Sequence, residues 1–353
     1  MSGYAIEWFV AAFGIGLLGL LACAFRILPD ERWQFVATVP LRKHGDGSWI
    51  GANFTYYGLL SAIAQVAAFA IVIALAGAVG VGFGAMTALA AVFLVVVLPS
   101  ARWVARIVEG KQHTFTICGA MFVAVVVLPA AIAAANLLLR AAGAAEMPML
   151  PVLAAIAVAY TFGEGLGRSA CISFGCCYGK PVSEMSGFGR RVFKRLHFVF
   201  EGDTKKIAYA DRLAGVPVVP IQALTAILHV VVGLVCLWLF LRGWFRLALA
   251  VSMVSTQLWR VFSESLRADF RGFGAITAYQ KMALASAAIA LAYALGLTQP
   301  PVAAPDVIAG LNLLWSPWPL LLLQTVGIVS FVYSGRSEVT SARVTIDIHH
   351  DRI

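Results

Sequence analysis

The sequence predicts an all-α polytopic membrane protein with about nine transmembrane helices, a small polar head domain and a short C-terminal tail. Apolar residues make up 61% of the 353 residues and charged residues only 12%, whereas a soluble domain is nearer half apolar and a quarter charged. The mean hydropathy is strongly positive, +0.88. Apolar stretches long enough to cross a bilayer, about 20 residues each, recur along the chain.

The predicted spans follow from these apolar stretches. They are roughly 6–26, 57–77, 80–99, 117–139, 149–172, 219–241, 244–265, 280–297 and 312–333. The second and third are separated only by a Gly-rich turn near Gly77 to Gly82. Many of the segments are rich in Ala and Gly, which allows helices to pack closely in lipid.

The polar stretches between the spans suggest three regions. We expect N-terminal transmembrane helices at 1–99, a membrane core at 100–297, and an extra helix with a soluble tail at 298–353. Within the core, the loop 175–218 is long and too polar to be embedded, so it forms the head domain. The tail sequence ARVTIDIHHDRI alternates apolar and polar residues, which makes a short strand plausible.

Basic residues are distributed unequally between the two sets of loops. Of the 26 Lys and Arg residues, 21 fall on the face that carries the head loop. Only Arg140, Arg242 and Arg246 fall on the opposite face, and Arg168 and Arg260 lie near helix ends. The positive-inside rule places the basic face in the cytoplasm. A site for anionic phospholipid head groups offers a competing explanation, because it would be basic on either side.

The sequence GRSACISFGCCYGKP, residues 167–181, lies where an apolar segment meets water. Arg168 is an ionisable residue at a helix end. Such residues are costly inside a membrane, so Arg168 is a candidate functional residue. Its guanidinium forms a rigid fork of donors suited to a phosphate, and Glu164, one helical turn earlier, can hold it. Neighbouring glycines, including Gly167, would let a lipid head group approach the backbone. The alternative is an arginine that merely extends to the interface.

A second polar group occurs in QLWRVFSESLRADFRG. Arg260, Glu264 and Arg267 are spaced i, i+4 and i+7, so they share one helix face. Arg260 lies inside the apolar seventh segment, with Glu264 as its expected partner. Two membrane helices that end on the same face, each with an intramembrane arginine, suggest a phosphate clamp.

These residues resemble the prolipoprotein diacylglyceryl transferase family over about residues 100 to 297. Gly167-Arg168, followed by a Gly-rich turn and Tyr178-Gly179-Lys180-Pro181, is similar to the variant of its signature that contains G-C-C-Y-G-[KR]-P-T. Arg260, Glu264 and Arg267 resemble its Y-x-x-x-R-x-x-x-E-x-x-R run. Pro220 and Gln222 resemble part of its H-P-x-Q-L-Y-E.

The resemblance implies an integral membrane enzyme that moves the diacylglyceryl group of phosphatidylglycerol onto a lipobox cysteine and releases glycerol phosphate. Arginines would bind the departing phosphate, where fixed cations lower the barrier. It implies catalytic roles for Arg168, Arg260, Glu264 and Cys176. It implies substrate binding by a second set of residues: Arg267, Gly167, Gly179, Lys180, Gln222, Cys171 and His113. No cofactor or metal is required by this scheme.

Several positions depart from the family pattern. The family's asparagine is Cys171, its glutamate is Cys176, and its tyrosine before the second arginine is Thr256. Its H-G-G corresponds to Cys118-Gly119-Ala120, with His113 five residues upstream as a potential substitute. The residues expected to activate the acceptor have changed while both arginines remain.

Three readings of Cys171, Cys176 and Cys177 stay open. The favoured one is small structural residues at a tight turn. The second is a thiol that acts as nucleophile or handles the acceptor proton, because nearby cations lower the pKa of a thiol. The third is a metal site, although the spacing C-x4-C-C is not a standard zinc pattern.

The sequence therefore favours a multi-pass enzyme of the bacterial inner membrane. It would transfer a glycerolipid-derived group from an anionic phospholipid to an acceptor that need not be a lipoprotein cysteine. A lipid, a small molecule and a lipoprotein all remain as acceptors, and we expect no nucleic acid partner. The alternatives are a non-catalytic lipid-binding or assembly protein, and a membrane thiol or metal protein.

Overall fold

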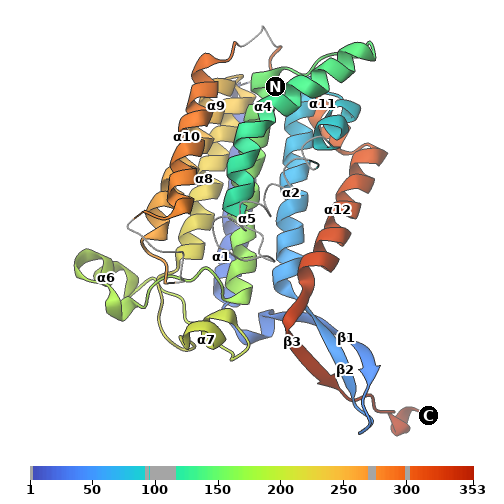
Figure 1. Cartoon of the computed structure of the whole chain (residues 1–353), viewed down its shortest axis with the longest axis vertical. Coiled ribbons are helices and arrows are strands. Elements are labelled where there is room, and N and C mark those ends of the chain that lie inside the picture. The colour runs from blue at the N-terminus through green and yellow to red at the C-terminus, as the bar shows by residue number, and fades with distance from the viewer. Residues whose placement is uncertain (1–2, 92–94, 96–116, 269–275, 299–302) are drawn as a thin grey trace.

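The computed structural model describes residues 3–91, 95, 117–268, 276–298 and 303–353. Long helices run side by side as a bundle, and a small head and a β-sheet project from one end (Figure 1). The long helices are α1 (Gly3–Ile27), α2 (Tyr56–Ala78), α4 (Ile117–Ala141), α5 (Met149–Phe174), α8 (Ile221–Leu241), α9 (Phe245–Glu264), α10 (Ala278–Gly296) and α12 (Pro317–Gly335). The shorter helices are α6 (Gly187–Phe193), α7 (Lys206–Asp211) and α11 (Val307–Leu314).

The helical character of the prediction is confirmed, but the count of nine spans is not. Among the described residues, six helices are long and apolar enough to cross a membrane: α1, α2, α4, α5, α8 and α12. Helices α9 and α10 run alongside them but are more polar; α9 contains Arg246, Arg260 and Glu264. The predicted span at 80–99 lies partly outside the described residues.

A small three-stranded antiparallel sheet accompanies the mostly helical fold. Its strands are β1 (Phe35–Lys43), β2 (Trp49–Thr55) and β3 (Arg336–Val344), in the order β1-β2-β3. β2 is central, and its Asn53 is buried between Thr38 of β1 and Thr340 of β3, with hydrogen bonds to both. The tail strand predicted within residues 342–353 is largely wrong, because β3 begins earlier, at Arg336, and ends at Val344.

The sheet is anchored to the bundle where two helices meet. β3 continues directly from α12, and α2 follows directly from β2. Gly58 of α2 lies against Gly335 of α12, and a Cβ on Gly58 would come within 2.1 Å of the Gly335 Cα. The Thr55 hydroxyl donates to the Gly335 carbonyl at 3.0 Å. Residues near both ends of the chain therefore form one projection from the membrane core.

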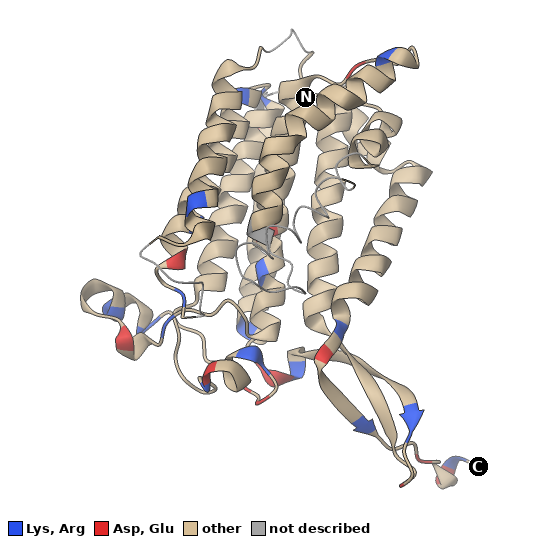
Figure 2. Ribbon diagram, viewed as in Figure 1, with Lys and Arg blue, Asp and Glu red and all other residues tan. Residues whose placement is uncertain are grey.

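Charge is segregated along the bundle as the sequence predicts. Most Lys and Arg residues gather at the end that carries α6, α7 and the sheet (Figure 2). At the opposite end, Arg242 pairs with Glu7 of α1, and Arg246 donates to three backbone carbonyls at the end of α10 and just beyond it. The predicted basics at 102, 106, 111 and 271 lie outside the described residues. Which end faces the cytoplasm stays a prediction.

The head has its own apolar core, which packs under the ends of α1 and α5. Tyr178, Phe200, Ile207 and Val218 are each 1% exposed or less. Lys205 lies among them fully buried, and its Nζ donates to the carbonyls of Leu28 (3.2 Å) and Ser173 (2.6 Å). Burial lowers the pKa of Lys205 to about 8. The head is thus fixed to the bundle where the motif at 167–181 leaves the membrane.

Candidate functional site

The C-terminus of α5 shapes the cysteine motif. Gly175 adopts a left-handed conformation (φ 68°), and its N–H and that of Cys176 donate back to the carbonyls of Ile172 and Cys171. This is the hydrogen-bond pattern of a Schellman helix end, for which glycine is the favoured residue. Because the chain reverses here, Cys176 returns beside Cys171. Cys177 then also has a positive φ, 56°.

The next residues join the ends of α8 and α9. Lys180 N–H donates to Leu266 just after α9, at 2.9 Å, and Lys180 accepts from Val219 just before α8, at 3.0 Å. Gly179 lies so close that a Cβ there would be 2.4 Å from the Val219 carbonyl oxygen. The backbone of the Y-G-K-P segment therefore connects the end of α9 to the start of α8. The Lys180 side chain is exposed.

A narrow polar pocket lies where α5, α8 and α9 converge beside this segment. Its free volume is about 20 Å³, room for little more than a water molecule. The lining residues are Tyr160, Glu164, Arg168, Cys177, Ile221, Gln222, Thr225, His229, Thr256, Trp259, Arg260, Ser263, Glu264 and Arg267. The fold thus brings together Arg168, Gln222, Arg260, Glu264 and Arg267, which the sequence had nominated separately.

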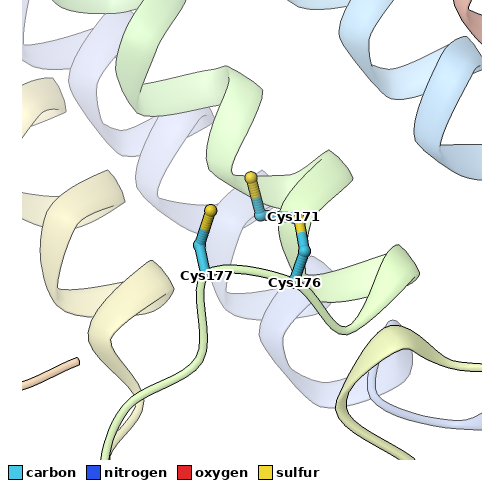
Figure 3. A group of neighbouring side chains, drawn as sticks. All are labelled: Cys171, Cys176 and Cys177. Atoms are coloured by element: carbon cyan, nitrogen blue, oxygen red, sulfur yellow. The ribbon is translucent and has the colours of Figure 1, made fainter. Parts of the chain in front are cut away.

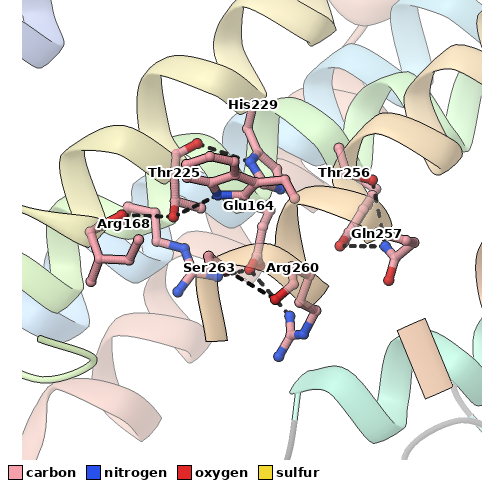
Figure 4. Close-up of polar contacts among 11 residues, drawn as sticks. Glu164, Arg168, Thr225, His229, Thr256, Gln257, Arg260 and Ser263 are labelled. Carbon is pink, nitrogen blue, oxygen red and sulfur yellow. Dashed lines mark hydrogen bonds and ion pairs between the residues drawn. The ribbon is translucent and has the colours of Figure 1, made fainter. Parts of the chain in front are cut away.

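Glu164 holds the two arginines together (Figure 4). Its Oε1 pairs with Arg168 one turn along α5, as predicted, and lies 3.7 Å from Nη1 of Arg260 on α9. All three side chains are largely buried: Glu164 is 10% exposed, Arg168 14% and Arg260 18%. Among the described residues, the Nε atoms of both arginines are buried without a hydrogen-bond partner. One carboxylate therefore pairs with two guanidiniums, and the Nε–H group of each guanidinium makes no hydrogen bond to it.

The start of α8 forms a polar wall of the pocket. Gln222 Nε2 donates to the Cys176 carbonyl at 2.8 Å, which links α8 to the cysteine turn. Trp259 Nε1 on α9 donates to the Thr225 hydroxyl at 3.0 Å, and that hydroxyl in turn donates to the carbonyl of Ile221. These bonds fix α8 and α9 in register around the two arginines.

His229 is a pocket residue that the sequence analysis missed. It lies on α8 and is 3% exposed, and its Nδ1 lies 2.9 Å from the Thr225 carbonyl oxygen. A carbonyl can only accept, so Nδ1 carries a proton and donates it to Thr225. The sequence feature that could have identified His229 is a single histidine within the apolar run AILHVVVG, one turn after Thr225.

Tyr160 is a second residue that was missed. It precedes Glu164 by one turn of α5 and lines the pocket, and its hydroxyl accepts from Gln257 Nε2 at 3.3 Å. Thr256, which stands at the position of a tyrosine in the resembling motif, also lines the pocket and donates to the carbonyl of Ser252. A tyrosine therefore reaches the pocket from α5 instead of α9.

The cysteines form a compact group next to the pocket (Figure 3). The sulfur atoms of Cys171, Cys176 and Cys177 all lie within 4.8 Å of one another, and no disulfide joins them. Cys176 is buried, whereas Cys177 is the member that lines the pocket.

Other nominated residues have different surroundings from those expected. A Cβ on Gly167 would meet Ala64 of α2 at 3.8 Å, and a Cβ on Gly163 would meet Ala68 at 2.9 Å. Gly163 therefore lets α2 pack closely against α5, whereas a Cβ on Gly167 would make an ordinary contact, and its role in head-group binding stays a prediction. His113 lies outside the described residues, as does the side chain of Cys118.

A second, apolar pocket of about 320 Å³ lies among α1, α2, α5, α8 and α11. Phe162 and Leu166 of α5 line it, and they flank Glu164 in sequence. The other linings are alanine, leucine, isoleucine, valine and phenylalanine side chains. One helix, α5, thus contributes to a cationic polar pocket and to an apolar pocket suited to hydrocarbon.

Comparison with known families gives one match. The family model described as prolipoprotein diacylglyceryl transferase matches residues 48–296, which is more than half of the chain. The match includes α5, α8 and α9 and therefore every residue of the polar pocket. No individual curated protein matches the chain.

Proposed function

Because the chain belongs to the prolipoprotein diacylglyceryl transferase family, we propose that it transfers a diacylglyceryl-type group from an anionic phospholipid to a nucleophilic acceptor. Phosphatidylglycerol is the donor that fits best, and the acceptor need not be a lipoprotein cysteine. The observation that carries the proposal is the convergence of Arg168 and Arg260, from two helices, on one shared carboxylate.

The donor's phosphate would take the position that Glu164 now shares with the arginines. A phosphate and a carboxylate both accept from a guanidinium fork, and charge-assisted bonds of this kind are among the strongest. The buried Nε atoms of Arg168 and Arg260 supply donors that Glu164 leaves unused. Because the pocket has so little free volume, the side chains must move apart to admit the phosphate. Arg267 also lines the pocket and adds positive charge.

In the proposed reaction, the acceptor atom attacks the diacylglyceryl carbon that carries the phosphate oxygen. The carbon–oxygen bond breaks, its electron pair goes to that oxygen, and glycerol phosphate leaves. Negative charge grows on the phosphate in the transition state, so fixed arginines bind that state more tightly than the substrate. The neutral Nε2 of His229 takes the proton from the acceptor.

The apolar pocket supports a lipid donor. Its wall is almost entirely hydrocarbon and it shares α5 with the polar pocket. A phospholipid acyl chain already lies in hydrocarbon, so it can enter such a pocket without exposing apolar surface to water. We assign this pocket to an acyl chain of the donor, while the arginines hold its head group.

A non-catalytic lipid-binding protein is the second candidate function. It is favoured by the cysteines that stand where the family resemblance places an asparagine and a glutamate, at Cys171 and Cys176. Such a protein would bind the anionic lipid with the same arginines but release no glycerol phosphate.

A turnover assay separates the two candidates. Purified protein in vesicles that contain phosphatidylglycerol labelled in the terminal glycerol should release labelled glycerol phosphate when an acceptor is supplied. Lipidomics of a deletion strain, searching for a lipidated product that disappears, identifies the natural acceptor. Saturable binding of the labelled lipid without any release would favour the non-catalytic candidate.

A further inference from the structure

The turn after α5 brings three cysteine side chains from two segments of the chain together. Cys171 comes from the last turn of α5, and the Schellman turn at Gly175 returns Cys176 and Cys177 to the same place. All three sulfurs are mutually within 4.8 Å, so one ion placed among them can contact all three. Figure 3 shows Cys171 on the last turns of α5 and Cys176 and Cys177 on the segment that follows, with the three side chains near one another.

A disulfide accounts for this arrangement less well. One disulfide would use two of the thiols and leave the third beside it without a role. Cys176 and Cys177 are adjacent in sequence, and a bond between adjacent cysteines is geometrically constrained. A metal ion uses all three sulfurs at once.

The ligand set points to a soft or borderline cation. Thiolates select zinc, monovalent copper and iron–sulfur clusters over magnesium or calcium. Catalytic zinc sites have three protein ligands and leave a fourth position for a substrate. Here Cys177 belongs both to the sulfur group and to the lining of the polar pocket. An open fourth position therefore has access to the pocket in which Arg168 and Arg267 also lie.

We propose that Cys171, Cys176 and Cys177 bind a zinc ion whose open position takes the sulfur of a thiol acceptor. This inference rests on the proposed transfer function. Zinc replaces the acceptor-activating groups that this chain lacks relative to the family pattern, and it does so at two of the same positions, Cys171 and Cys176. The charges also agree, because three thiolates and Zn²⁺ leave one net negative charge beside two arginines.

The step balances without any redox change. The acceptor thiol binds the zinc and loses its proton to His229, because coordination deprotonates a thiol. The bound sulfur attacks the diacylglyceryl carbon, and the carbon–oxygen bond breaks. The electron pair of that bond goes to the phosphate oxygen, and the arginines stabilise the departing anion. The product is a thioether, a weaker ligand than the thiolate, so it leaves the metal and the position reopens.

The test is zinc content of the full-length protein, purified in detergent without chelators. We expect one zinc per chain by elemental analysis, and a thiolate-to-cobalt charge-transfer band after replacement by Co²⁺. Each of Cys171→Ser, Cys176→Ser and Cys177→Ser should weaken zinc binding at least about ten-fold. Cys23→Ser and Cys236→Ser are matched controls at an exposed and a buried free thiol, and both should retain the metal.

Two further measurements keep the inference testable if a substituted protein fails to fold. In the wild type, zinc should protect three thiols from alkylation, and a chelator should expose them together. A folded, zinc-free wild type, or zinc that survives all three substitutions, would overturn the inference.

Arg168→Ala should keep its zinc and lose transfer. Transfer by a metal-free wild type refutes the zinc site alone, whereas bound zinc with unimpaired transfer by Arg168→Ala refutes the arginine clamp alone.

Discussion

Glu164 on α5 and Arg260 on α9 lie 3.7 Å apart across the bundle. The same Glu164 oxygen also pairs with Arg168 on its own helix. A carboxylate that is 10% exposed therefore neutralises two arginines in the membrane region. Under the proposed function, this carboxylate is the internal counter-ion that an anionic lipid would displace.

Glu164→Gln tests this counter-ion role. The substitution keeps the shape but leaves two largely buried guanidiniums without their anion, and breaking a buried pair on one side is strongly destabilising. We expect a lower melting temperature in lipid-free detergent, with a larger recovery on adding phosphatidylglycerol than the wild type shows. Neutral phosphatidylcholine is the control lipid. Equal recovery with the two lipids would mean that no phosphate replaces the carboxylate.

His229→Ala tests the proton acceptor. Loss of a general base typically lowers a rate by about 10²- to 10⁴-fold, so we expect kcat to fall on this scale with little change in the KM for phospholipid. His197→Ala, at an exposed head position, is the matched control and should remain active. A full rate in His229→Ala would remove the histidine from the mechanism.

Local patterns made the helices predictable. The span predicted at 149–172 is α5, Met149–Phe174, and that predicted at 219–241 is α8, Ile221–Leu241. Apolar length fixes such segments because the backbone must satisfy its hydrogen bonds within each helix in lipid. The i, i+4 pairing of Glu164 with Arg168 was predictable for the same local reason.

Long-range pairings were not predictable in this way. The sequence suggested Glu264 as the partner of Arg260, which stays a prediction, and only the packing of α5 against α9 shows that Glu164 lies beside Arg260. The sheet was missed because β2 pairs with β3 from the far end of the chain, as at Ile50 and Arg343. Half-exposed strands of this kind have a weak sequence pattern. His229 was missed because one polar residue hardly changes an apolar run.

Lys205 predicts a pH dependence of stability in the head. Its pKa falls to about 8 in the folded protein and returns to about 10.4 when unfolded. The unfolded chain thus binds more protons between these values, so the stability contributed by Lys205 is complete above pH about 10.4 and is lost as the pH falls through about 8. The difference is on the order of 3 kcal/mol.

Thermal melts of the detergent-solubilised protein from pH 7 to 10.5 measure this effect. Lys205→Met should flatten the rise in stability with pH that the wild type shows. Lys206→Met, at the neighbouring exposed position, should preserve it. Indistinguishable pH profiles for the two variants would contradict a depressed Lys205 pKa.

The basic end of the bundle predicts the orientation. The sequence assigns 21 of the 26 Lys and Arg residues to the face with the head loop, and each contributes roughly 1 kcal/mol near an anionic leaflet. We expect the head and C-terminus in the cytoplasm. A C-terminal fluorescent protein that matures only inside should fluoresce, and alkaline phosphatase at the same position should be inactive. Active phosphatase, with outside labelling of a cysteine placed near Gly202, as in Asp203→Cys at an exposed position, would reverse the orientation.

The arginine clamp is the central claim, and helix α9 offers a matched pair of substitutions to test it. Arg260 lies in the polar pocket, whereas Arg246 lies at the other end of the same helix and donates to backbone carbonyls. The measurement is the rate of glycerol phosphate release from labelled phosphatidylglycerol in vesicles, for Arg260→Ala and Arg246→Ala prepared identically.

We predict that Arg260→Ala loses at least about 10²-fold in rate, the scale of one lost transition-state donor. Arg260→Lys should recover little of it, because lysine lacks the planar fork. Arg246→Ala should keep most of the activity. Release by Arg260→Ala at the rate of Arg246→Ala would contradict the account.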